Sequence, residues 1–191
     1  MFVNDVDPDE SMKFESKRHA NAKQKEPEFM FPESLSVNLD NAPAYWFLNA
    51  LHLLLAHNES GEGAYSLIHL SAPPELETPY YIHHDEDEAF YVLEGEITVI
   101  RNGEKIVAGP GSYIFLPRGV PHGFRVSSAN GSKVLIHVIP GGKVGFVSMM
   151  LEMATPVWDR HNLPAATPPD LKRLGALCEQ NSISILGILP T

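Results

Sequence analysis

The central part of the chain consists of short runs of apolar and β-branched residues, separated by glycine, proline and asparagine. Within several runs the apolar positions alternate with polar ones, which is the period of a strand with one buried face. Strands are predicted up to Leu93 and over residues 97–101, 105–108, 112–116, 122–126 and 133–139. Short strands at this spacing, with turn residues between them, indicate an all-β sandwich or barrel.

Asn102 and Gly103 lie between two of these predicted strands. Both central residues of a type I′ turn need positive φ, and asparagine and glycine are the residues that adopt it most readily. We therefore expect a tight hairpin that joins residues 97–101 to residues 105–108.

The region before the central strands has two contrasting parts. Residues 1–28 are polar and charged with few aliphatic side chains, so they cannot bury enough surface to offset the entropy of ordering, and we expect a flexible tail or a strap on a partner subunit. Residues 45–57 are apolar on both faces, which fits a buried strand or a helix. The turn residues at 58–63 and the run at 64–70 favour strand, turn, strand. The apolar run fits a subunit interface or a buried layer between sheets.

The C-terminal region predicts one helix and one strand. Thr167 can cap a helix whose first position is Pro168, and Asn181 would end it. The residues on one face of this helix would be Leu171, Leu174 and Cys178. Residues 182–189 then fit a strand that packs on the barrel or on a second subunit.

Charge and composition exclude several classes of partner. The 191 residues carry a formal net charge of -10, with a pI near 5.3, which argues against binding to nucleic acid and to anionic membranes. Cys178 is the single cysteine, so an internal disulfide and a Cys-x-x-Cys zinc site are excluded. The acidic N-terminal residues do not fit a signal peptide, and no apolar run approaches the ~18 residues of a membrane helix. We expect a cytoplasmic protein.

Residues 79–95 hold the densest group of metal-binding side chains. Alternate residues of a strand share a face, so Tyr81 and His83 are expected to point together while His84 points toward the rim. Asp85, Glu86 and Asp87 are expected to form a solvated acidic loop.

A bend in this acidic loop would bring Glu88 onto the same interior as His83. His122, at the start of a later strand, would complete a set of two imidazoles and one carboxylate. Such a set suffices to bind Fe, Mn, Ni, Co or Zn. The alternative is a hydrogen-bonded interior without a metal.

Other histidines and aromatic residues are more ambiguous. Four histidines fit ordinary core or interface positions: His52, His57, His69 and His137. Four further residues fit either a pocket for a planar substrate or plain barrel filling: Phe90, Val92, Phe115 and Phe124.

Two segments resemble the two sequence motifs of the cupin superfamily. In the first, His83, Glu88 and Gly95 stand at the positions of the second histidine, the glutamate and the glycine. Tyr81 stands where the family has its first histidine, so this chain departs from the motif there. Three roles for Tyr81 follow: it lies beside a three-residue metal site, it joins that site or binds a water on the metal, or it marks the loss of the metal.

The second segment, residues 111–126, is similar to the second cupin motif at Gly111, Pro117, Gly119 and His122. Over about residues 35 to 190 the chain resembles small bacterial cupin-2 proteins described as quercetin 2,3-dioxygenase-like.

The resemblance implies a single double-stranded β-helix, or jelly-roll barrel, with extra N-terminal strands and a short C-terminal helix. The cupin domain would cover residues 29–191, with its motifs at 79–95 and 111–126 and a C-terminal extension at 142–191.

The implied function is that of a metal-dependent enzyme, an oxygenase acting on a small aromatic or enolisable substrate. Its metal, a divalent Fe, Mn, Ni, Co or Zn ion, would be bound by His83, Glu88 and His122, with Glu88 and Tyr81 as catalytic residues. Two alternatives are a non-catalytic barrel that binds a small ligand and an isomerase or epimerase. A homodimer is the expected assembly.

Overall fold

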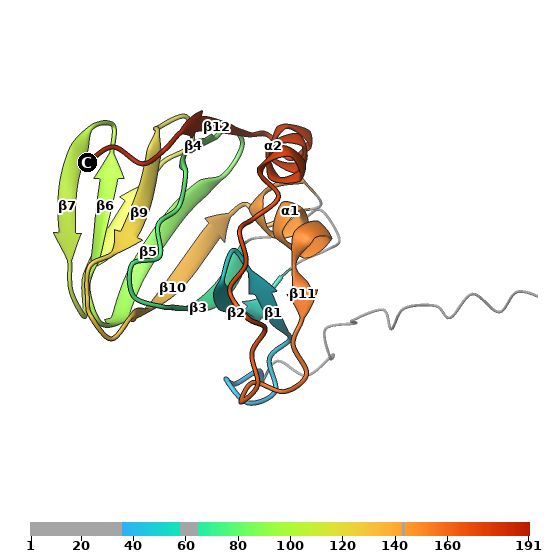
Figure 1. Cartoon of the computed structure of the whole chain (residues 1–191). Coiled ribbons are helices and arrows are strands. Elements are labelled where there is room, and N and C mark those ends of the chain that lie inside the picture. Colours follow the sequence, from blue (N-terminus) through green and yellow to red (C-terminus); the bar gives the residue numbers. More distant parts are fainter. Residues whose placement is uncertain (1–35, 58–64, 143) are drawn as a thin grey trace, which may run out of the picture. The chain divides into compact units, whose positions relative to one another are not determined.

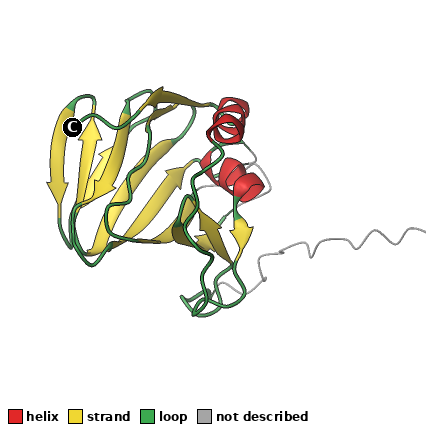
Figure 2. Cartoon of the chain, in the orientation of Figure 1, coloured by secondary structure: helices red, strands yellow, loops and turns green. Residues whose placement is uncertain are grey.

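The computed structural model describes residues 36–57, 65–142 and 144–191. Within these ranges the chain is mostly antiparallel β-strand with two short helices (Figure 2). The all-β jelly-roll class is therefore confirmed. The predicted tail at residues 1–28 and the predicted turn at 58–63 lie outside the described residues.

The larger sheet has seven strands in the order β11-β1-β2-β3-β10-β5-β8. Figure 1 labels the strands of this sheet from β11 to β5. The central strand β10 pairs with β3 on one side and with β5 on the other, and its inward side chains Val134, Ile136 and Val138 are buried. The strands of this sheet are β1 (Ala44–Phe47), β2 (Ala50–Ala56), β3 (Ser66–Ala72), β5 (Asp87–Glu94), β8 (Tyr113–Leu116), β10 (Ser132–Ile139) and β11 (Thr155–Pro156).

The smaller sheet has five strands in the order β12-β4-β9-β6-β7. Its strands are β4 (Tyr80–His83), β6 (Ile97–Arg101), β7 (Glu104–Ala108), β9 (His122–Val126) and β12 (Ile183–Gly187). The turn between β6 and β7 places Asn102 at φ 48° and Gly103 at φ 82°, so the predicted hairpin with two positive φ values is confirmed.

The inner faces of the two sheets pack against each other. Phe90 of β5 meets Phe124 of β9 edge to face, with ring centroids 5.2 Å apart. Aromatic pairs favour this arrangement because the positive ring edge meets the negative ring face. The contact shows that the buried sides of both sheets form one core.

The run at residues 45–57 forms strands rather than a helix, as the sequence favoured, but an unpredicted turn at Leu48 and Asn49 divides it into β1 and β2. Phe47, His52 and Leu54 of this run are buried within the chain itself. The burial fits a layer inside the barrel, which was one of the two alternatives for this run.

Two helices, α1 (Phe146–Met153) and α2 (Leu171–Gln180), follow the central strands and lie next to each other (Figure 1). The helix α1 was not predicted, because its sequence is apolar on most sides and lacks a side-chain cap. Among the described residues, the helices fall short of the length and apolarity that a membrane crossing by a helix requires.

The predicted start of α2 was wrong by three residues. Asp170, not Thr167, caps the helix, and its side chain accepts a hydrogen bond from the backbone N–H of Arg173 at 3.0 Å. The backbone of Thr167 is instead paired with the side chain of Asn49. The predicted end at Asn181 is confirmed, since its N–H donates to the carbonyls of Leu177 and Cys178.

Candidate metal centre

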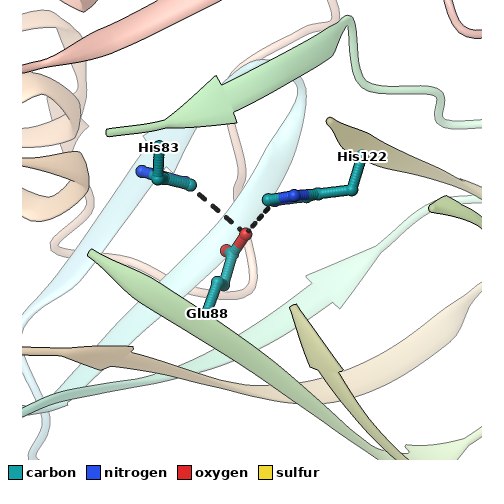
Figure 3. Close-up of side chains that lie close together, drawn as sticks. All are labelled: His83, Glu88 and His122. Carbon is teal, nitrogen blue, oxygen red and sulfur yellow. Dashed lines mark hydrogen bonds and ion pairs between the residues drawn. The ribbon is translucent and has the colours of Figure 1, made fainter. Parts of the chain in front are cut away.

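Three strands bring the predicted ligands together inside the barrel: His83 ends β4, Glu88 lies near the start of β5, and His122 begins β9 (Figure 3). The strands β4 and β5 belong to different sheets. The bend between them, at His84 and Asp85, therefore lets His83 and Glu88 face each other from opposite sides. All three side chains are at most 1% exposed.

The two imidazoles converge on a single oxygen of Glu88. The Nε2 atom of His122 lies 3.0 Å from Oε2 of Glu88, and the Nε2 atom of His83 lies 3.5 Å from the same oxygen. The other ring nitrogen of His122, Nδ1, lies 2.8 Å from the carbonyl oxygen of Val120, to which it can only donate. Nε2 of His122 then turns a lone pair toward a carboxylate oxygen, which is also an acceptor. A cation between these two atoms, either a proton or a metal ion, would resolve the conflict.

The separations fit a shared metal ion. Two ligand atoms that each lie about 2.1 Å from an ion are about 3.0 Å apart at a right angle and about 3.4 Å apart at a tetrahedral angle. The observed contacts to Glu88 Oε2 are 3.0 and 3.5 Å, and one ligand atom from each of the three residues lies within 4.8 Å of the others. In addition, neither ring nitrogen of buried His83 has a hydrogen-bond partner among the described residues. The donor set and its spacing therefore fit a divalent ion.

The charges of the pocket favour a bound cation. Burial alone would lower the pKa of His83, but the carboxylates of Glu86 and Glu88 raise it to about 9. Burial alone would raise the pKa of Glu88, but His122 and His83 lower it to about 2. Buried carboxylates are costly without a compensating positive charge.

Tyr81 lies beside the cluster as a hydrogen-bond donor. Its hydroxyl donates to Oε2 of Glu88 at 2.9 Å, and its ring packs edge to face with the ring of His122 at a centroid distance of 4.5 Å. Burial, followed by the charge of Glu88, raises the pKa of Tyr81 well above its usual value. The side chain is therefore a neutral phenol at physiological pH.

The acidic loop differs from the prediction at one residue. Asp85 is exposed, and Asp87 pairs with Arg118 at 2.9 Å near the surface, but Glu86 is only 4% exposed. Oε2 of Glu86 lies 3.4 Å from Nδ1 of His83 and accepts a hydrogen bond from the N–H of Phe146. The prediction of a solvated Glu86 was wrong, because helix α1 covers it.

Within the described part of the chain, the other histidines lie outside the three-residue cluster. His84 is exposed and contacts the hydroxyl of Ser184 at 2.8 Å, as expected for a rim residue. His137 stacks on Tyr65, and His69 is buried with no hydrogen-bond partner for either ring nitrogen among the described residues. His52 lines the cavity described next.

The cluster borders a cavity with a volume of about 80 Å³. His83, Glu88 and Tyr81 line this cavity, together with His52 and Thr78. The wall is otherwise largely apolar, and its larger members include Phe47, Leu70, Leu76, Phe124, Ile136, Phe146, Met149 and Leu174.

A row of rings forms one side of this cavity. The centroid distances are 5.6 Å from His52 to Phe47, 6.4 Å from Phe47 to Phe146 and 6.1 Å from Phe146 to His83, all edge to face. The sequence did not predict the part played by Phe146, since it belongs to the unpredicted helix α1.

The four residues proposed as an aromatic pocket have three different locations. Phe124 lines the cavity, whereas Phe90 and Val92 are completely buried. Phe115 is 44% exposed on the outer side of β8, so its assignment to the pocket was wrong. Strand alternation explains the outcome, because Ile114 and Leu116 take the inward positions.

Comparisons with known proteins agree with this architecture. Residues 68–139 match the Cupin_2 family, described as a cupin domain. A quercetin 2,3-dioxygenase from Bacillus subtilis (strain 168) is 26% identical over 91 residues, which cover 48% of this chain and 27% of the relative. The chain thus spans about a quarter of the length of this curated relative.

Two solved structures illustrate the similarity. KdgF from Halomonas sp. is 20% identical, with a TM-score of 0.49, over 56% of this chain and 93% of that protein. The polyketide cyclase RemF from Streptomyces resistomycificus is 26% identical, with a TM-score of 0.47, over 55% of this chain and 78% of that protein. With its two-sheet fold and the family match at residues 68–139, this chain contains a cupin domain.

Proposed function

We propose that this chain is a metal-dependent enzyme, an oxygenase that acts on a small aromatic or enolisable compound. The main support is the approach of two histidine Nε2 atoms to one oxygen of Glu88, at 3.0 and 3.5 Å, beside a largely apolar cavity. The curated relative, named as a quercetin 2,3-dioxygenase, supports oxygenase chemistry.

The proposed metal ligands are His83, Glu88 and His122. Two imidazoles and one carboxylate suit divalent Fe, Mn, Ni, Co or Zn. Such an ion would act as a Lewis acid toward a substrate oxygen.

Glu88 and Tyr81 are the proposed catalytic residues. The lowered pKa of Glu88 keeps its carboxylate ionised at neutral pH, so it can accept a proton from a substrate hydroxyl. The neutral hydroxyl of Tyr81 donates to this carboxylate and so orients it toward a substrate in the cavity. Tyr81 also borders the cavity, where its ring can position a substrate.

The aromatic residues that line the cavity support a planar substrate. The ring row from His52 through Phe47 and Phe146 to His83 offers aromatic edges and faces along one wall. The polar atoms of the metal centre lie at the His83 end of this row. A compound with one oxygen-bearing end and an apolar body would match both features.

A second candidate is an isomerase or epimerase. It is favoured by the contacts of Glu88 Oε2 with the hydroxyl of Tyr81 at 2.9 Å and with His122 at 3.0 Å, because these groups can pass protons without oxidising a substrate. The two candidates differ in one measurable way, since an isomerase turns over substrate without consuming O₂. A barrel that only binds ligand would show neither turnover nor O₂ uptake.

The deciding experiment is metal analysis of the purified protein, followed by oxygen uptake with small aromatic and enolic compounds, including quercetin. We expect about one equivalent of a transition metal and substrate-dependent O₂ consumption. The His122→Ala variant is the control and should lose both. A content far below one equivalent that Fe, Mn, Ni, Co and Zn all fail to restore would contradict the proposal.

A further inference from the structure

We infer that Glu86 is a positioning residue, which fixes the ring of His83 in the tautomer that binds metal and ties helix α1 to that histidine. The inference rests on the proposed metal centre and adds a residue that lies outside the ligand set. It also assigns a role to a buried carboxylate that the proposed chemistry does not use.

Glu86 is an anomaly within its own loop. Its neighbour Asp85 is exposed, and Asp87 pairs with Arg118 near the surface, whereas Glu86 is 4% exposed. Burying a carboxylate is unfavourable unless hydrogen bonds or charges compensate for the lost water. Its oxygen Oε2 accepts a hydrogen bond from the N–H of Phe146 at 2.7 Å and makes a longer, charge-type contact with Nδ1 of His83 at 3.4 Å.

The contact with His83 determines which ring nitrogen can bind a metal. An ionised carboxylate only accepts hydrogen bonds, so Nδ1 of His83 carries the proton when it faces Glu86. A metal ion that displaces the proton on Nε2 would then be bound by Nε2 beside Oε2 of Glu88, which lies 3.5 Å from that nitrogen. In metal-binding histidines the second ring nitrogen usually donates to a carboxylate or a backbone carbonyl, which fixes the tautomer and the ring orientation.

His122 provides an internal comparison. Its Nδ1 atom lies 2.8 Å from the carbonyl oxygen of Val120, and its Nε2 atom faces Glu88. Both histidines thus have the same arrangement, with an acceptor at Nδ1 and the candidate metal position at Nε2. They differ in that the acceptor is a nearby backbone carbonyl for His122 and the carboxylate of Glu86 for His83.

The contact with Phe146 links the same carboxylate to helix α1. The segment around Gly145 packs so closely on Glu86 that a Cβ at Gly145 would overlap the carboxylate, and Gly145 has a φ of 138° that side chains disfavour. The N–H of Gly145 donates to the side chain of Asn181, which ends α2. The start of α1 is therefore held between the metal centre and α2.

The position of α1 in turn shapes the cavity. Phe146 and Met149 of α1 line it, and the ring of Phe146 meets the ring of His83 edge to face at 6.1 Å. A single carboxylate thus contacts both a candidate ligand and the first residue of a helix that covers the cavity. A displacement of the carboxylate at either contact should therefore change the other contact as well.

The test compares Glu86→Gln with Asp85→Asn in the full chain. Each variant removes one negative charge from the loop, but Asp85 is exposed. The glutamine keeps the shape of Glu86 and can still accept from Phe146 N–H through its oxygen. Because the same oxygen also faces Nδ1 of His83, the glutamine removes the charge on that acceptor and favours the proton on Nδ1 less strongly, which opposes metal binding at Nε2.

The primary readout is the dissociation constant for Zn²⁺, or for Mn²⁺, added to metal-free protein. We expect it to rise about 10- to 100-fold in Glu86→Gln and to change less than about threefold in Asp85→Asn. Equal affinities in wild type and Glu86→Gln would overturn the positioning role while leaving the metal centre intact. A wild type that binds neither ion would instead refute the proposed function.

The link to α1 has its own readout, hydrogen exchange of the amides of residues 146–153 in metal-free protein. Glu86→Ala removes the acceptor for Phe146 N–H, so we expect these amides to exchange at least about tenfold faster than in wild type, with little change in β6 and β7. Asp85→Asn should exchange like wild type. Unchanged protection of α1 in Glu86→Ala would overturn the link whatever the metal affinities show.

Discussion

The hydroxyl of Tyr81 donates a hydrogen bond of 2.9 Å to Oε2 of Glu88. The same oxygen faces the Nε2 atoms of both His83 and His122. Because burial and the charge of Glu88 raise the pKa of Tyr81, the phenol keeps its proton and acts as a donor. This bond separates the role of Tyr81 from that of the three candidate ligands.

Replacement of Tyr81 by phenylalanine should therefore weaken the fold more than it weakens metal binding. A hydrogen bond to a charged group contributes about 1.5 kcal/mol or more, so we expect Tyr81→Phe to lower the free energy of unfolding by about that amount. Urea denaturation measures this change, and metal analysis should still find about one equivalent. Loss of the metal in Tyr81→Phe would show that the phenol is needed to hold the ion.

Tyr81→His tests the three-residue centre by adding a possible ligand instead of removing one. An added imidazole next to Glu88 can serve as a fourth ligand, so we expect tighter binding than in the parent protein. Competition with a chelator of known affinity gives the comparison. If the variant binds metal and the parent does not, the parent centre is degenerate and the proposed enzyme is contradicted.

Glu88→Gln should abolish metal binding without a comparable effect on packing. Glutamine has the shape of glutamate but lacks its charge, which leaves two neutral imidazoles as the remaining ligands. We expect elemental analysis of the purified variant to find far less than the roughly one equivalent expected in the parent. His137→Ala is a suitable control, because His137 stacks on Tyr65 away from the cluster and its loss should leave the metal content unchanged.

Buried His52 should make stability depend on pH. Burial lowers the pKa of His52 to about 4, while the hydrogen bond to the carbonyl of Ala50 opposes the shift. In the unfolded chain His52 has the ordinary histidine pKa of 6.5, so the unfolded chain binds a proton more readily than the folded chain. Stability is full above pH 6.5 and is lost as the pH falls toward 4, by about 3 kcal/mol in total.

The measurement is urea denaturation of metal-free protein from pH 7 to pH 4, in parallel with His52→Leu. Leucine does not titrate. As the pH falls, the unfolding free energy of the wild type should therefore decrease relative to that of His52→Leu. A constant difference across this range would show that His52 does not titrate with the lowered pKa.

The assignment of Asp170, rather than Thr167, as the cap of α2 can be tested by substitution. Asp170 accepts from the N–H of Arg173, so Asp170→Ala should lower the free energy of unfolding by about 1 kcal/mol. Thr167→Ala should have almost no effect, since the contacts of Thr167 with Asn49 use only its backbone. Equal losses in the two variants would contradict the assignment of the cap.

Local patterns in the sequence determined the strands and the candidate ligands. Alternation along β4 placed Tyr81 and His83 on the same side and His84 on the other, and the structure has them so. The hairpin at Asn102 followed from the φ values that its two central residues permit. These features depend on neighbours in the chain, so the sequence alone was sufficient to predict them.

Contacts between distant segments decided what local patterns could not. Three acids in a row looked alike, yet Glu86 is buried because the N–H of Phe146, sixty residues later, lies 2.7 Å from it. Thr167 was a plausible cap until its backbone paired with Asn49, 118 positions earlier in the chain.

The sequence by itself thus determined the all-β class and three residues able to bind a metal. The tertiary structure decided that their atoms converge on one oxygen of Glu88, that Tyr81 donates to that oxygen, and that Glu86 connects the cluster to α1. The physical reason is that strand period is a property of adjacent residues. The burial and partners of a carboxylate, in contrast, depend on which remote backbone groups pack against it.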